Sequence, residues 1–94
     1  MKVVTQGSQS AARLALLLRF TKIDSEDMID ALNDYLVKGL ASSTAADING
    51  VDRANLNRAV NTINDAAIVV EEIKNLDYQG SYLSHLKDNS DAKS

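Results

Sequence analysis

Apolar residues recur at helical spacing along most of this chain, and the pattern predicts five helical segments. Leu17 and Leu18 lie three and four residues after Leu14, Leu16 leaves apolar surface on another side, and Ser10 can cap a first helix through about Phe20. A second helix is predicted from Ser25 to Gly39, because glycine favours a left-handed helix end. Its apolar positions follow the i, i+3, i+4, i+7 pattern and are Met28, Ala31, Leu32 and Tyr35.

The stretch 42–63 predicts two short helices joined by a tight turn at Gly50. Glycine tolerates the left-handed backbone angles that such a turn requires, Ala46 is small enough for a close helix crossing, and Asp52 can cap the second helix. The apolar inner face is expected to hold Ile48, Val51, Leu56 and Ala59. This layout is typical of a helix-turn-helix, whose second helix enters a DNA groove; an ordinary helical hairpin is the alternative.

Polar residues on the outward face of the second helix are candidates for DNA binding. Arginine and asparagine contact guanine and adenine edges through paired hydrogen bonds, and arginine also binds phosphate. The predicted DNA-binding residues of this helix are Arg53, Asn55, Asn57, Arg58 and Asn61.

The apolar pattern continues beyond this helix with alternating spacings of three and four residues. The positions concerned are Leu56, Ala59, Ile63, Ala66, Val70 and Ile73. Either the recognition helix runs on to about Leu76, or it breaks near 61–65, where Thr62 can cap a fifth helix. The weak helix formers in that stretch favour the break.

Ninety-four residues are enough for a single domain. The helical pattern predicts that this domain is all-α, with four to five helices that include the helix-turn-helix. Residues 1–9 show no usable period and are expected to form a mobile arm, and residues 77–94 a flexible tail. A domain this small is barely stable alone, so we expect a homo-oligomer. The predicted oligomerisation residues are Leu14, Leu16, Leu17, Phe20, Val69, Val70 and Ile73, with a place in the core as the alternative.

Composition and charge narrow the functional classes. The chain has no cysteine, which excludes disulfides and cysteine metal sites and fits a cytoplasmic protein, and the apolar run Leu14–Leu18 is too short to span a membrane. The net charge of −3 argues against DNA binding. Residues 1–60 are nevertheless neutral, with seven basic and seven acidic side chains, and local patches decide phosphate affinity.

Candidate catalytic chemistry is absent from the sequence. His85 is the only histidine, and it lies in the predicted tail. Glu71 and Glu72 are adjacent, so they point to different sides of a helix and cannot act as a carboxylate pair. We therefore expect no enzyme activity, no cofactor and no metal site.

A family resemblance rests on Asp34-Tyr35-Leu36-Val37-Lys38-Gly39, which is preceded by Ile23-x-Ser25 and followed by the helix-turn-helix. With the rest of the stretch from Leu14 to Tyr78, this element resembles the PapB-type adhesin-biosynthesis transcription regulators of bacteria. The resemblance implies a small all-helical regulator of fimbrial or related operons that binds AT-rich double-stranded DNA as an oligomer. Ser43 and Thr44 stand where family members carry basic residues, and they complete the predicted DNA-binding set.

The alternative function is an acidic helical interaction module, such as an anti-repressor, that uses the first helix and the stripe 66–73. Both functions predict oligomers. The polar and cationic face over 53–61 separates them, because a module that binds only proteins has no need of it. The operator sequence, the groove, the oligomer number and the direction of regulation stay open at this point.

Overall fold

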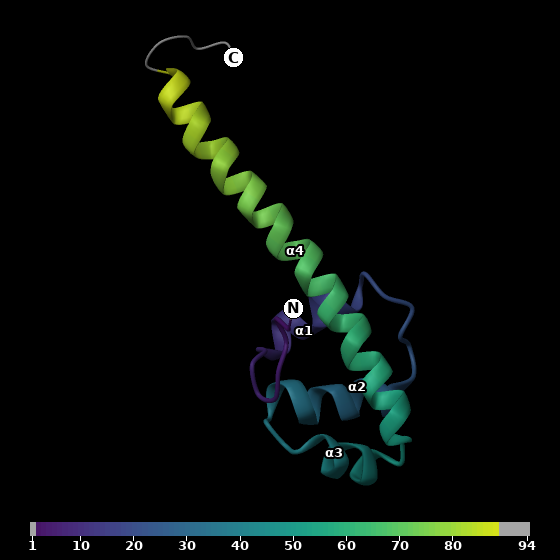
Figure 1. The fold of residues 1–94 in the computed structure, drawn as a ribbon. Coiled ribbons are helices and arrows are strands. Elements are labelled where there is room, and N and C mark those ends of the chain that lie inside the picture. Colours follow the sequence, from purple (N-terminus) through teal and green to yellow (C-terminus); the bar gives the residue numbers. More distant parts are fainter. Residues whose placement is uncertain (1, 89–94) are drawn as a thin grey trace.

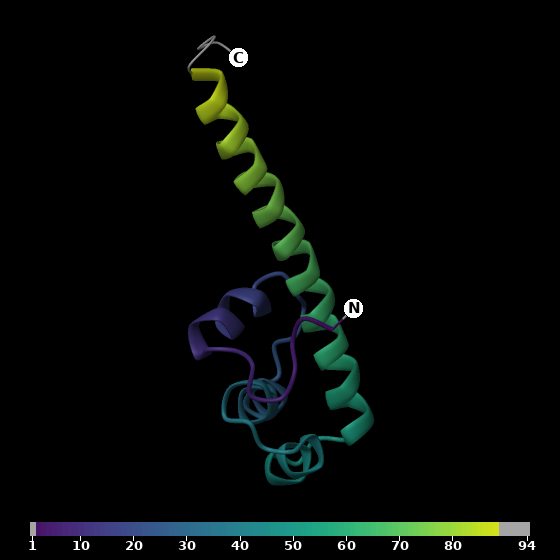
Figure 2. The ribbon, with the colours of Figure 1, turned by 60° about the vertical axis from the view of Figure 1, so that its left-hand side comes forward.

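Four α-helices and one π-helical turn make up the chain in the structure, a computed structural model that describes residues 2–88, with side chains described through residue 78. In chain order they are α1 (Ala11–Leu18), α2 (Glu26–Leu32), the π-helical turn η1 (Asn33–Val37), α3 (Ser42–Asn49) and α4 (Arg53–Asp88). Helices α1 to α3 gather around the first half of α4, whose second half extends away from them (Figure 1, Figure 2). The all-helical prediction is confirmed, since residues 2–88 contain no strand.

The predicted caps begin the first two helices. The hydroxyl of Ser10 accepts from the amide of Arg13 at 3.1 Å, and that of Ser25 accepts from the amide of Met28 at 3.3 Å. Helix α2 passes into η1, where the amide of Lys38 donates to the carbonyl of Asn33, five residues back. Gly39 then ends this second helical segment at φ +82°, as its position predicted.

The core lies where α1, α2 and α3 meet the first half of α4. Its largest fully buried side chains are Leu32, Leu36, Leu56, Ile63 and Val4. Burying one such side chain stabilises the fold by about 1.5–3 kcal/mol, so this cluster supplies much of the driving force for folding.

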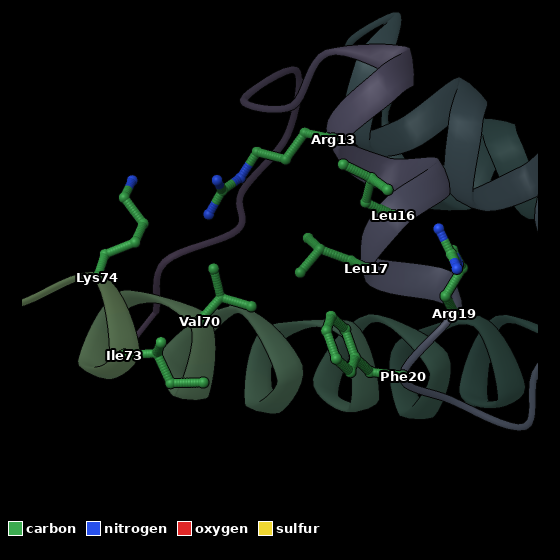
Figure 3. Close-up of a pocket in the computed structure, with 8 residues that line it drawn as sticks. All are labelled: Arg13, Leu16, Leu17, Arg19, Phe20, Val70, Ile73 and Lys74. Atoms are coloured by element: carbon green, nitrogen blue, oxygen red, sulfur yellow. The ribbon is translucent and has the colours of Figure 1, made fainter. Parts of the chain in front are cut away.

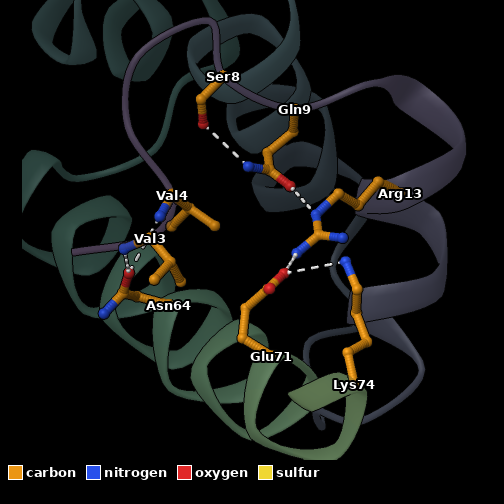
Figure 4. A network of polar contacts seen from close by, with 8 residues as sticks. All are labelled: Val3, Val4, Ser8, Gln9, Arg13, Asn64, Glu71 and Lys74. Atoms are coloured by element: carbon orange, nitrogen blue, oxygen red, sulfur yellow. Dashed lines mark hydrogen bonds and ion pairs between the residues drawn. The ribbon is translucent and has the colours of Figure 1, made fainter. Parts of the chain in front are cut away.

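The N-terminal segment packs against the helices and is not the mobile arm that we predicted. Val4 is fully buried, and the amides of Val3 and Val4 donate to Oδ1 of Asn64 on α4 at 2.7 and 3.1 Å (Figure 4). The amide of Gly7 donates to the carbonyl of Tyr35 at 2.9 Å, and the amide of Gln9 to that of Leu36, also at 2.9 Å. Because hydrogen bonds to residues distant in the sequence hold this segment, its packing leaves no periodic apolar pattern in the sequence.

Helix α4 is continuous, so the predicted break near 61–65 is wrong. Ile63 is fully buried there, and Asn64 is buried and bonded to the N-terminal segment. The hydroxyl of Thr62 donates back to the carbonyl of Arg58 at 3.1 Å within the same helix. Tertiary packing outweighs the weak helix propensity of this stretch.

The helix also continues through Asp88, where a flexible tail from about residue 77 was expected. The rest of that prediction, together with any role of the His85 side chain, lies outside the described residues. Among residues 2–88, no helix combines the length and the apolar character needed to cross a membrane.

Candidate nucleic-acid interface

The turn between α3 and α4 has the geometry that the sequence predicted. Gly50 ends α3 at φ +68° and ψ +27°, in the left-handed region. The amide of Val51 donates to the carbonyl of Ala46 at 3.0 Å, and that of Gly50 to the carbonyl of Asp47 at 3.3 Å. These two bonds form a Schellman motif, in which glycine is favoured because the backbone angle disfavours any side chain. A Cβ atom at Gly50 would meet nothing within 4 Å, so space does not require the glycine.

The inner face of the motif is buried as expected, with one exception. Ala46 and Leu56 are fully buried, Ala59 is nearly so and Val51 is half-buried. Ile48, predicted for this face, is instead 65% exposed. Helix α3 turns Ala45 and Ala46 inward, and at about 100° per residue Ile48 falls on another side of the helix.

Helix α3 is held in place by a polar contact with η1. The side-chain amide of Asn49 donates to Oδ2 of Asp34 at 2.8 Å and to the carbonyl of Ala45 at 2.8 Å. Oδ1 of Asp34 also forms an ion pair with Nζ of Lys38, at a distance of 3.5 Å. The first helix of the motif is thereby anchored beside the Asp34–Gly39 element on which the family resemblance rested.

The predicted DNA-binding residues of α4 are all exposed, and they occupy two edges of its outward face. Arg53, Asn57 and Asn61 follow one another at intervals of four and lie along one edge. Asn55 and Arg58 lie on the other edge, where the guanidinium of Arg58 donates to Oδ1 of Asn55. On α3, Thr44 is exposed and Ser43 half-buried.

The two arginines of this face differ in their electrostatic surroundings. Nη2 of Arg53 lies 3.2 Å from Oδ2 of Asp47 in an exposed ion pair. Arg58 has no carboxylate within 4 Å among the side chains described. Its charge is therefore the more available to an incoming anion.

A second feature is a groove of about 570 Å³ between α1 and α4 (Figure 3). Its floor is apolar, and cationic side chains stand at its rim. The apolar lining is Leu16, Leu17, Phe20, Val70 and Ile73, and the cations are Arg13, Arg19 and Lys74.

The groove divides the predicted oligomerisation residues into two groups. Leu14 and Leu17 are only 2% exposed and belong to the core of the monomer, which was the alternative to a place in the interface, although Leu17 also lines the groove. Leu16, Phe20, Val69 and Ile73 are exposed, and Val70 is half-buried. The spacing of the leucines could not tell the buried from the exposed ones, because apolar residues cover much of the circumference of this short helix.

The structure adds residues that the sequence argument did not select. Leu76 and Tyr78 are exposed and extend the apolar side chains of α4 beyond Ile73. The i, i+3 spacing from Ile73 to Leu76 carried that signal. At one end of the groove, Glu71 accepts from Nη2 of Arg13 at 3.0 Å and from Nζ of Lys74 at 3.5 Å (Figure 4).

Helices, turn and outward polar face together define a small all-helical domain that carries a helix-turn-helix. Over residues 1–77 the chain matches the sequence family described as adhesin biosynthesis transcription regulatory protein, or PapB, and it belongs to that family. The resemblance inferred from Asp34–Gly39 is thus confirmed.

A solved structure supports the same fold. The chain is similar to E. coli FocB with a TM-score of 0.73 and 20% sequence identity, and the match covers 78% of this chain and 83% of that one. A comparison with curated proteins found no match. No group of three or more side chains suited to a metal ion comes together within the described part of the chain.

Proposed function

We propose that this protein binds double-stranded DNA with the N-terminal half of α4 and so regulates transcription of a fimbrial, adhesin or plasmid-borne operon in the cytoplasm. The observation that carries the proposal is the Schellman turn at Gly50, which leaves the polar face of α4 exposed beside α3. An α-helix with its side chains is about 10–12 Å wide, which matches the major groove of about 12 Å. Membership of a transcription-regulator family points the same way.

The charge of the protein sets the expected strength of this binding. Only Arg53 and Arg58 on the motif are cationic, and the chain as a whole carries −3. Each neutralised phosphate contributes about 0.9 to the slope of log K against log salt, so one subunit should bind weakly and with a small slope. Several subunits on neighbouring sites would recover affinity through their effective concentration.

The occupant that we propose for the α1–α4 groove is a second copy of this chain. Leu16 on α1, Phe20 just after α1, and Val69 and Ile73 on α4 are exposed around it. Leu76 follows Ile73 at helical spacing on the part of α4 that extends away from the other helices. Contiguous apolar surface of this kind is typical of association sites. Arg13 and Lys74 of the rim are paired with Glu71, but Arg19 has no carboxylate within 4 Å among the side chains described, and it suits a partner that is acidic, as the chain itself is.

The same surface supports the second candidate, a module that binds another protein. In that case the apolar groove would be the functional site, and the polar face of α4 would be only a solvated surface. The proposal of DNA binding includes no catalysis and no cofactor.

A binding titration separates the two candidates. Fluorescence anisotropy with an AT-rich duplex and a duplex of mixed sequence, each at two salt concentrations, should show binding that weakens with salt and favours the AT-rich duplex. Arg58→Ala should reduce it while the circular dichroism stays unchanged. Absence of binding by the folded oligomer to either duplex at low salt would reject DNA binding and leave the protein-binding candidate.

A further inference from the structure

The cations of the described chain fall into two groups. Carboxylates within 4 Å engage Arg13, Lys38, Arg53 and Lys74. Among the side chains described, no carboxylate lies that close to Lys2, Arg19, Lys22 or Arg58. In a chain with a net charge of −3, the second group is the positive charge within residues 2–78 that is free to meet a polyanion.

Two members of this second group, Lys22 and Arg58, line one shallow pocket. The pocket, of about 370 Å³, lies where the connection between α1 and α2 runs beside the first turns of α4 (Figure 1). Asn55 and Thr62 of α4 and Asp24 of the connection also line it. Lys22 is exposed, so its ammonium group is accessible from outside.

We propose that Lys22 is a second, sequence-independent contact to DNA, binding a backbone phosphate on the side of the groove next to Arg58. The inference rests on the proposed function, in which α4 enters a DNA groove. A helix about 10–12 Å wide fills a groove of about 12 Å, so an element lying along its flank meets the phosphates of the groove wall. The connection with Lys22 is such an element, and lysine binds phosphate as a point charge.

A substitution at Asp24 tests whether negative charge in the same pocket opposes DNA binding. Asp24 lines the pocket together with Lys22 and Arg58, and a carboxylate there would repel a phosphate bound in it. Asp24→Asn should therefore strengthen DNA binding, whereas Lys22→Ala should weaken it. A purely structural role of the connection would not produce effects of opposite sign.

The experiment measures anisotropy of the AT-rich and mixed duplexes over a salt series for the full chain and its variants. Lys22→Ala should weaken binding to both duplexes by the same factor, about two- to fivefold, and lower the salt slope by about 0.9 for each subunit bound. Lys22→Arg should restore both quantities. Lys38→Ala is the matched control, because it removes the same charge from a lysine that is already paired with Asp34.

The outcomes distinguish this inference from the proposed function. If Arg58→Ala weakens binding but Lys22→Ala leaves affinity and salt slope unchanged, the Lys22 contact is wrong and DNA binding by α4 stands. A loss confined to one duplex, or an equal loss in Lys38→Ala, also overturns the inference, since it would indicate a base contact or a net-charge effect. If the unmodified protein binds neither duplex, the proposed function fails first.

Discussion

Arg53 and Asp47 are joined by an ion pair of 3.2 Å that spans the Gly50 turn and ties the first residue of α4 to α3. Arg58, five residues further along α4, has no such carboxylate among the described residues, and its guanidinium donates to Asn55. One arginine of the proposed recognition surface is thus partly neutralised within the protein, and the other is not.

This difference predicts unequal effects of the two arginines on DNA binding. Arg58→Ala should cost about 1–3 kcal/mol on the preferred site if the guanidinium reaches a base edge. Arg53→Ala should cost less, because Asp47 already competes for its charge. Anisotropy titrations of both variants measure the difference, and circular dichroism controls for folding. Unchanged affinity in the double variant Arg53→Ala, Arg58→Ala would contradict the assignment of this face to DNA.

Gly50 is predicted to be required for its backbone conformation alone. At φ +68° a β-branched side chain is strained, so Gly50→Val should lower the free energy of unfolding by about 1–3 kcal/mol. Gly50→Asn should cost less, since asparagine tolerates the left-handed region. Both variants are compared by urea unfolding followed by circular dichroism. No Cβ clash exists at this position, so equal losses in the two variants would refute the conformational explanation.

Leu16 and Leu17 are neighbours in α1, but mutation of Leu16 should affect self-association and mutation of Leu17 should affect the stability of the fold. Leu16 is 56% exposed beside the α1–α4 groove, so Leu16→Asp should reduce the oligomer number and leave the helices intact. Leu17 is buried, and Leu17→Ala should destabilise the fold by about 2–5 kcal/mol. Sedimentation equilibrium and thermal unfolding measure the two effects. A monomeric unmodified protein at tens of micromolar would contradict the proposed self-association.

Asn64 should stabilise the fold through the N-terminal segment. Asn64→Ala removes the acceptor of the amides of Val3 and Val4, and a buried amide without a partner costs about 1–3 kcal/mol. Asn61→Ala is the matched control on the same helix, because Asn61 is exposed and a change there should stay within about 0.5 kcal/mol. Chemical denaturation gives both values. Hydrogen exchange should accelerate at the Val3 and Val4 amides only in Asn64→Ala, and unchanged protection there would show that the segment is held by other contacts.

Local chemistry in the sequence was sufficient to predict several elements. Ser10 and Ser25 cap helices because a side-chain hydroxyl satisfies an amide of the first turn, and this depends only on neighbouring residues. Gly39 and Gly50 take positive φ for an equally local reason, the absence of a Cβ atom. The turn of the helix-turn-helix, and with it the set of exposed polar residues on α4, followed from these positions.

Contacts between residues distant in the sequence decided what the sequence alone left open or predicted wrongly. Residues 3 and 4 bond to Asn64, some sixty positions away, and neither partner carries a local signal of the other. That bond and the burial of Ile63 keep α4 continuous where propensity favoured a break. Burial also separates Leu16 from Leu17 and turns Ile48 outward, because the neighbouring helices cover only one side of each short helix. Helical periodicity fixes which residues share a face, and tertiary packing alone determines which face is covered.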